Sequence, residues 1–234
     1  MMIILNCLIG TSVSEGLLTI IPANSHEEAS SILVATLIDS ITSTNDKQSL
    51  GLAGGSTPQL TYMMLREYSK VISGLQLWLT DERWVDSNNK ESNSRMIKES
   101  FNSEKIDLLL PEYSGKNPSI DANNYTTKLL SSIKNFTHGI LGIGEDGHTA
   151  SLFPNSNALE ENRIGIVATR VSVEPYIRLT ATFELLSKID NLYLLATGTN
   201  KKDIVNKVIK EIEESPITKL ISMRNETIII TDQI

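Results

Sequence analysis

The sequence has little cysteine: Cys7 is the only one among 234 residues. A lone cysteine cannot form an internal disulfide, and it offers no Cys-x-x-Cys spacing that would hold zinc. We therefore expect neither a disulfide framework nor a metal site. Because disulfides mark oxidising compartments, this composition favours a cytoplasmic protein.

Basic and aromatic residues are also few. The chain carries 21 Lys and Arg against 28 Asp and Glu, a formal net charge of −7, and aromatic residues make up 5% of it. The acidic balance argues against a nucleic-acid partner, because such binding depends on clustered cations. It also means that an anionic ligand needs several cations gathered at one place. With few aromatics, the core must consist of Leu, Ile and Val, which is typical of a parallel sheet covered on both faces.

Long apolar runs are missing as well. Residues 1–10 are apolar, but Asn6 interrupts them and no basic residue precedes them, so they match neither a membrane span nor a secretory signal. We expect residues 1–15 to form an N-terminal extension or a first strand. We expect residues 16–234 to form one α/β domain, since no repeat or change of composition marks a boundary between two smaller ones.

Strand-like and helix-like segments alternate along the rest of the chain. This alternation predicts an α/β fold with one mostly parallel sheet and helices on both faces. In such sheets, ligands bind beyond the carboxyl ends of the strands. We predict strands at residues 17–22, 49–53, 75–80, 139–143, 164–169, 177–182, 192–196 and 227–231, and helices at residues 25–41, 58–65, 96–101, 123–133 and 202–212.

Three segments at predicted strand ends carry polar groups suited to chemistry, and the first is Gly54-Gly55-Ser56-Thr57-Pro58. Its glycines let the backbone approach an anion closely, and its two hydroxyl groups can donate hydrogen bonds. The proline suits the first position of a helix whose free N–H groups would face that anion. The alternative is an ordinary strand-to-helix turn that binds nothing.

The second segment is Asp81-Glu82-Arg83-Trp84-Val85, with Ser92 and Asn93 downstream. Arg83 can bind a phosphate or carboxylate through two N–H groups, or it can stabilise an oxyanion. Asp81 can orient a base or hold the arginine. The alternative is a salt-bridged loop in solvent.

The third segment runs from Gly142 to Pro154 and places Asp146 two residues before His148. It lacks the G-x-G-x-x-G spacing of a dinucleotide-binding loop. A carboxylate next to a histidine can provide a general base and the acid that orients it, whereas the alternative is a hydrogen-bonded structural histidine. The other two histidines, His26 at a predicted helix start and His138 before a strand, are expected to be structural or exposed.

In their order and spacing, the three segments resemble the signature blocks of the 6-phosphogluconolactonases, within a superfamily shared with the glucosamine-6-phosphate isomerases. Pro175-Tyr176-Ile177-Arg178 resembles a later proline–arginine segment of that family, although two residues here separate the proline from the arginine. Gly198-Thr199-Asn200-Lys201 resembles its glycine-to-lysine turn. The resemblance covers most of the chain, and the third block is its most specific part.

The resemblance implies a Rossmann-like sheet, no cofactor, and hydrolysis of 6-phospho-D-glucono-1,5-lactone, a small sugar-phosphate lactone, in the oxidative pentose phosphate pathway. Carried over by position, His148 is the general base, Asp146 is the carboxylate beside it, and Asp81 and Arg83 complete the reacting centre. We expect no membrane partner and a monomer or small homo-oligomer. The residues implied in binding the sugar phosphate are Gly54, Gly55, Ser56, Thr57, Arg178 and Lys201.

Two other functions are alternatives. A glucosamine-6-phosphate deaminase or isomerase follows its Gly-His pair with an Asn-Glu-Pro element whose glutamate assists the histidine, but Leu152-Phe153-Pro154 stands here. A non-catalytic sugar-phosphate sensor that regulates transcription usually carries a DNA-binding module, and neither a helix-turn-helix nor a basic patch is evident. A serine-hydrolase route is disfavoured because the sequence has no G-x-S-x-G elbow.

Overall fold

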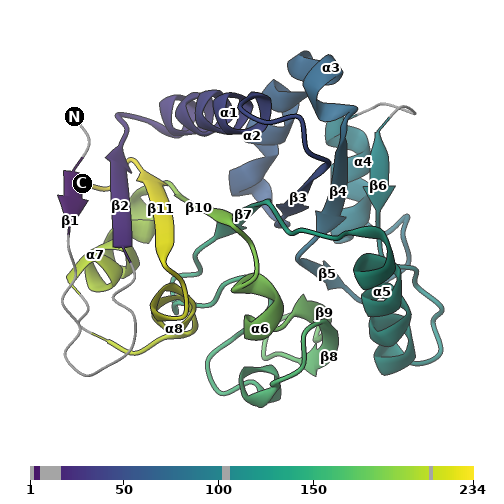
Figure 1. Ribbon diagram of the computed structural model, residues 1–234. Coiled ribbons are helices and arrows are strands. Elements are labelled where there is room, and N and C mark those ends of the chain that lie inside the picture. The colour runs from purple at the N-terminus through teal and green to yellow at the C-terminus, as the bar shows by residue number, and fades with distance from the viewer. Residues whose placement is uncertain (1–2, 6–16, 102–105, 211–212) are drawn as a thin grey trace.

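The computed structural model describes residues 3–5, 17–101, 106–210 and 213–234. Its centre is an eight-stranded sheet in the order β1-β2-β11-β10-β7-β3-β4-β6, in which β1 pairs antiparallel and the other seven strands are parallel (Figure 1). The predicted mostly parallel α/β fold is therefore confirmed. Cys7 lies outside the described residues. The strands are β1 (Ile3–Leu5), β2 (Leu17–Pro22), β3 (Gln48–Leu52), β4 (Leu75–Leu79), β6 (Asp107–Leu109), β7 (His138–Gly142), β10 (Asn191–Ala196) and β11 (Glu226–Thr231).

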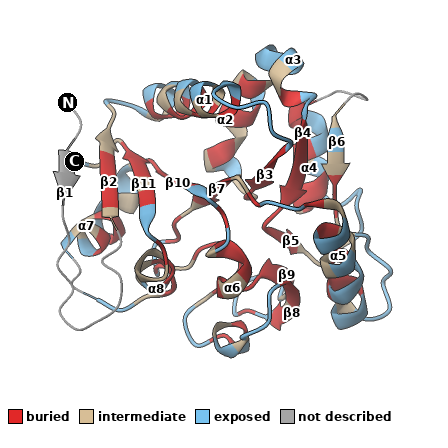
Figure 2. Ribbon diagram, viewed as in Figure 1, coloured by how far each residue is buried: buried red, intermediate tan, exposed pale blue. Residues whose placement is uncertain are grey.

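Helices cover both faces of the sheet, as predicted, and one aliphatic core lies under each set (Figures 1 and 2). On one face are α1 (His26–Thr42), α2 (Ser56–Leu65), α3 (Ser69–Ile72) and α4 (Asn93–Phe101). On the other are α5 (Pro118–Ser132), α6 (Phe183–Leu186), α7 (Lys202–Lys210) and α8 (Pro216–Ser222). Three short 3-10 turns complete the described helices: η1 (Arg66–Tyr68), η2 (Asn157–Glu160) and η3 (Thr199–Lys201).

Local sequence signals set the helix ends. The Ser25 side chain accepts a hydrogen bond from the N–H of Glu28, which caps α1 as its position before the helix predicts. Asn117 caps α5 in the same way and is followed by a proline, so this helix begins earlier than the predicted residue 123. The predicted helix at residues 202–212 forms as far as Lys210, and its last two residues lie outside the described part.

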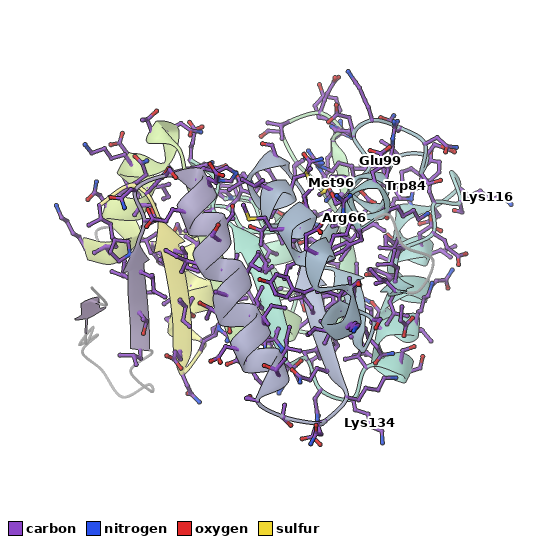
Figure 3. All side chains as sticks on the ribbon, turned by 90° about the horizontal axis from the view of Figure 1, so that it is seen from above. Arg66, Trp84, Met96, Glu99, Lys116 and Lys134 are labelled. Carbon is purple, nitrogen blue, oxygen red and sulfur yellow. The ribbon has the colours of Figure 1, made fainter. Side chains whose placement is uncertain are left out.

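Helices and loops provide most of the exposed surface (Figure 2). In Figure 2 the strands are largely buried, while the outward sides of α1 and α5 are exposed. Seen from above, the side chains of Lys116 and Lys134 point away from the molecule at its rim (Figure 3). Among the described helices, none has both the length and the apolar character that crossing a bilayer requires.

The strand order places a crevice at the middle of the sheet. The strands β3 and β7 are neighbours in the sheet. After β3 the chain continues to β4, on the side away from β7, whereas the next main-sheet strand after β7 is β10, on the side away from β3. Loops that depart in opposite directions from adjacent parallel strands open a crevice at their carboxyl ends. The loops after β3 and β7 carry the first and third segments singled out in the sequence.

Two predicted strands lie outside the main sheet. The strands β8 (Ile166–Arg170) and β9 (Ile177–Ala181) pair antiparallel with each other, and β9 also pairs with β5 (Asp81–Arg83). Thr80 connects the two sheets, because its N–H donates to Leu52 O of β3 and its carbonyl accepts from the N–H of Ala181. This small sheet brings the second predicted segment and Arg178 over the carboxyl ends of the main strands.

The buried histidine of the core is structural. His138, at the start of β7, has an exposed fraction of 2%, and its ring nitrogens lie 2.9 Å from the Ser40 hydroxyl oxygen and 3.0 Å from that of Thr137. Burial lowers the pKa of His138 to about 4. The neutral imidazole is therefore the form that the folded protein contains at neutral pH.

This depressed pKa predicts a loss of stability in mild acid. An unfolded histidine binds a proton below its usual pKa of about 6.5, whereas folded His138 stays neutral down to about pH 4. Through that window the unfolded state therefore gains protons, and the free energy of unfolding falls by up to about 1.4 kcal/mol for each pH unit. His138→Gln removes this titration. We expect the stability difference between wild type and variant, measured by urea unfolding, to shrink as the pH falls from 6.5 to 4; a constant difference would contradict the assignment.

Candidate active site

A cavity of about 570 Å³ lies over the carboxyl ends of the central strands. Its walls come from the loops after β3, β7 and β10 and from the small sheet. All ten residues predicted from the sequence line this one cavity, although they come from five segments far apart in the chain. They are Gly54, Gly55, Ser56, Thr57, Asp81, Arg83, Asp146, His148, Arg178 and Lys201.

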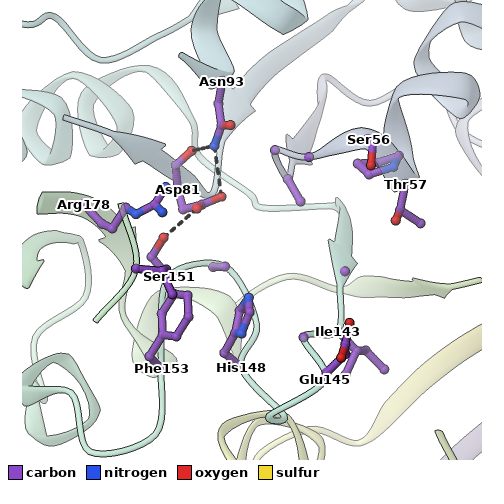
Figure 4. Close-up of a pocket in the computed structure, with 18 of the residues that line it drawn as sticks. Ser56, Thr57, Asp81, Asn93, Ile143, Glu145, His148, Ser151, Phe153 and Arg178 are labelled. Carbon is purple, nitrogen blue, oxygen red and sulfur yellow. Dashed lines mark hydrogen bonds between the residues drawn. The ribbon is translucent and has the colours of Figure 1, made fainter. Parts of the chain in front are cut away.

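The loop after β3 presents the free end of a helix to the cavity. Gly55 has φ of 99°, a left-handed conformation that favours glycine, and α2 begins at the next residue with no side-chain cap. The first N–H groups of α2 are thus available to an anion, and the Ser56 and Thr57 side chains lie at the same end of the helix (Figure 4). Pro58 is the third helical residue rather than the predicted first, which still leaves it in the turn where a missing N–H is tolerated.

The loop after β7 pairs His148 with Asp146. Nδ1 of His148 lies 2.5 Å from Asp146 Oδ1, and the backbone N–H of His148 donates to the same oxygen at 3.1 Å. A carboxylate facing Nδ1 assigns the proton to that nitrogen, which leaves the lone pair on Nε2. The ring also stacks on Phe153, with centroids 3.9 Å apart. A Cβ at Gly144 would lie 2.0 Å from Nδ1, so the loop needs glycine there to hold this pair.

Asp81 is a buried carboxylate held by neutral groups. Its Oδ2 accepts from the Ser151 hydroxyl at 2.7 Å, and its Oδ1 faces the Asn93 amide nitrogen at 3.4 Å (Figure 4). The same amide donates to the Asp81 carbonyl oxygen at 2.9 Å. Within the described residues, Asp81 forms no ion pair within 4 Å with either cavity arginine. The solvated salt bridge considered as an alternative is therefore absent at this position.

Two arginines lie side by side across the small sheet. Arg83 of β5 is directly opposite Arg178 of β9. Burial lowers the pKa of Arg178, the positive charge of Arg83 lowers it further, and the charge of Asp81 acts in the opposite direction. The Nε of Arg178 is buried and has no hydrogen-bond partner. Two neighbouring guanidinium groups, one with an unused N–H, form a region that an anion would stabilise.

Several residues that line the cavity are not among the site residues predicted from the sequence. Asn93 and Ser151 bind Asp81, and Phe153 supports His148, as described above. Their types gave no signal of this, because amides, hydroxyls and phenyl rings occur throughout folded proteins. The one signal in the sequence was their closeness along the chain to the predicted segments: Asn93 follows the second segment, and Ser151 and Phe153 lie within the third.

No metal site accompanies these residues in the described part of the chain, where no group of three His, Cys, Asp or Glu side chains is placed to hold an ion. Lys201, at the end of η3, contributes a further cation from the loop after β10. The loop of Lys201 also contacts that of His148, because the Asn200 amide donates to Glu145 Oε1 at 2.7 Å. The cavity thus combines one imidazole–carboxylate pair, a helix N-terminus and three cations.

Residues 23–229 match the family model described as glucosamine-6-phosphate isomerases/6-phosphogluconolactonase. The chain belongs to this family. A probable 6-phosphogluconolactonase of Dictyostelium discoideum is 29% identical, over 93% of this chain and 98% of the relative. A 6-phosphogluconolactonase of Helicobacter pylori is 32% identical, over 70% of this chain and 73% of the relative. A solved structure of 6-phosphogluconolactonase from Trypanosoma cruzi is similar with a TM-score of 0.81 and 26% identity, over 92% of this chain and 94% of that one.

The family membership and the arginine pair predict a specific response to phosphate. Arg178→Met should weaken the binding of inorganic phosphate about tenfold, because charge-assisted hydrogen bonds are lost. Without phosphate the variant should be no less stable than wild type, since burial of one guanidinium next to Arg83 is relieved. Thermal unfolding against phosphate concentration measures both effects.

Arg170→Met is the matched control for this experiment. Arg170 is an exposed residue of β8 whose guanidinium lies over the Tyr176 ring, so its removal changes the net charge equally without touching the cavity lining. Equal phosphate affinity in the two variants would count against the arginine pair as an anion site.

Proposed function

We propose that this protein hydrolyses 6-phospho-D-glucono-1,5-lactone to 6-phospho-D-gluconate. The observation that carries the proposal is the His148–Asp146 pair, whose Nε2 keeps its lone pair, in the same cavity as a helix N-terminus and three cations. Membership of the family and the names of its similar proteins support the same reaction. The single cysteine favours a cytoplasmic enzyme. The family resemblance implies that the reaction needs no cofactor, and the proposal includes a monomer or small homo-oligomer.

In the proposed mechanism, Nε2 of His148 removes a proton from a water molecule whose oxygen attacks the lactone carbonyl carbon. Asp146 holds the ring and stabilises the imidazolium that forms. The tetrahedral intermediate then collapses, the bond from the carbonyl carbon to the ring oxygen breaks, and that oxygen takes the proton from the imidazolium. A lactone is an activated ester, so one base and stabilisation of the oxyanion suffice without a covalent nucleophile.

The remaining residues hold the substrate in this scheme. The N-terminus of α2, with Ser56 and Thr57, suits the phosphate group, because free N–H groups and the helix dipole both favour an anion. Gly54, Gly55, Arg178 and Lys201 complete that assignment. Arg83 and Asp81 are assigned to the reacting centre, where the guanidinium can stabilise the oxyanion; because Arg83 lies opposite Arg178, its charge also attracts a free anion such as inorganic phosphate.

The environment of His148 favours hydrolysis over the deaminase chemistry of the same family. The position where a deaminase would carry a glutamate to assist the histidine holds Phe153, which stacks on the imidazole. A phenyl ring supports the orientation of the histidine but exchanges no proton. Asp146 is therefore the acidic group in contact with this ring.

His148→Ala should lower kcat by about 10²–10⁴, the range expected for loss of a general base, and leave KM within a few-fold of wild type. The assay follows fresh 6-phosphogluconolactone through coupled oxidation of 6-phosphogluconate. Because the lactone also opens unaided, rates are compared with buffer alone. If the variant hydrolyses the lactone as fast as wild type does, His148 is not part of the mechanism. If wild type does not hydrolyse it faster than buffer alone, the result favours a sugar-phosphate sensor.

Replacing both Ser56 and Thr57 by Ala should mainly raise KM for the same lactone. These hydroxyls are proposed to bind the phosphate equally in the ground state and in the transition state, so their loss weakens binding without changing the chemical step. We expect KM to rise about tenfold and kcat to change little. A fall in kcat at unchanged KM would contradict their assignment to the phosphate.

A further inference from the structure

Asn93 lies between the charged residues of the second segment. Asn93 is the first residue of α4 and lines the cavity, and its exposed fraction is 1%. The amide group contacts three parts of the site. It faces Arg83 and Asp81, and it fills the space above Gly54, where a Cβ would lie 2.0 Å from Asn93 Oδ1.

The hydrogen bonds fix which way the amide points. Nη1 of Arg83 lies 2.6 Å from Asn93 Oδ1, and a guanidinium can only donate, so the oxygen must face the arginine. The amide nitrogen then faces Asp81, where it donates to the carbonyl oxygen at 2.9 Å and approaches Oδ1 at 3.4 Å. One neutral side chain thus accepts from the cation and donates to the acid.

We propose that Asn93 is a positioning residue that keeps Arg83 and Asp81 apart as two unpaired charges, so that the guanidinium remains available to an anion in the cavity. An aspartate two residues from an arginine on one strand has the reach to form an ion pair with it. Here the amide satisfies both partners without neutralising either charge. The inference rests on the proposed function only in requiring that the cavity bind a phosphate group.

The backbone around Asn93 holds the amide in this place. Its N–H donates to Glu82 Oε1 at 2.6 Å, and the N–H of Ser94 donates to Oε2 at 2.7 Å. Glu82 stands between Asp81 and Arg83 in β5, so the start of α4 is attached to the strand that carries both charges. The backbone of Asn93 is thus held by Glu82 of β5, and its side chain contacts Asp81 and Arg83 of the same strand.

Asn93→Asp tests this role with little change of shape. The new carboxylate should pair with Arg83 and neutralise it, so we expect the dissociation constant of inorganic phosphate, measured by calorimetry, to rise about tenfold or more. Asn93→Ala should raise it less, about threefold, because Asp81 then approaches Arg83 but stays partly held by Ser151. The exposed Asn124→Asp carries the same change of charge on α5 and should bind phosphate as wild type does.

The outcomes separate positioning from a merely structural role. If Asn93 only maintains the fold, Asn93→Ala should impair binding more than Asn93→Asp, because alanine leaves a void; this order, or wild-type affinity in both variants, would overturn the proposal. If Asn93→Asp does not fold, as judged by circular dichroism, unchanged affinity in Asn93→Ala overturns it alone. Absence of phosphate binding by wild type would also overturn it. Failure of lactone hydrolysis with the expected order of affinities would instead remove the proposed function and leave this role intact.

Discussion

The buried carboxylate of Glu82 is the interaction on which the arrangement of the site depends. It accepts hydrogen bonds from the backbone N–H groups of Arg83, Asn93 and Ser94 and from the Ser92 hydroxyl. Burial raises the pKa of Glu82, while these donors and the N-terminal end of α4 favour its charged form. Hydrogen bonds to a charged group stabilise by about 1.5–3 kcal/mol each, so such an array can offset a desolvation cost of several kcal/mol.

The consequence of this contact is geometrical. Glu82 ties α4 to β5, and β5 pairs with β9, so one carboxylate fixes the helix that provides Asn93 relative to the strands that provide Asp81, Arg83 and Arg178. The parallel main sheet is the other rigid part of the site, and its loops after β3 and β7 line the same cavity. A site built from elements locked in this way loses little conformational freedom when it binds a ligand.

Much of this architecture follows from the sequence, because local patterns decide it. Most strands of the main sheet are short aliphatic runs that alternate with helical segments, and that alternation has few topological solutions. The strands at 166–170 and 177–181 looked the same along the chain but belong to another sheet. The second of them, β9, also pairs with β5, and that pairing depends on contacts between distant segments, which periodicity does not encode.

The same distinction applies to the site. Asp146 and His148 are two residues apart, so their pairing could be predicted from spacing and a glycine-rich loop. Asn93 and Ser151 reach Asp81 from different segments, and only the folded chain brings them together. Residue type pointed to the charged and titratable groups that line the cavity, whereas the neutral groups that hold them became visible only through their contacts.

The arrangement also explains how an acidic chain can hold an anion. Its net charge of −7 is spread over the whole molecule, and exposed charges beyond about 10 Å are screened by salt. Inside the cavity the nearby charges determine whether an anion is attracted. There Arg83 and Arg178 lie opposite each other on paired strands, and among the described residues neither forms an ion pair within 4 Å. Burial and the charge of Arg83 both disfavour the charged form of Arg178, and an anion bound beside the two guanidinium groups would relieve that cost. In the proposed function, the cost of burying Arg178 therefore lies where a bound phosphate would offset it.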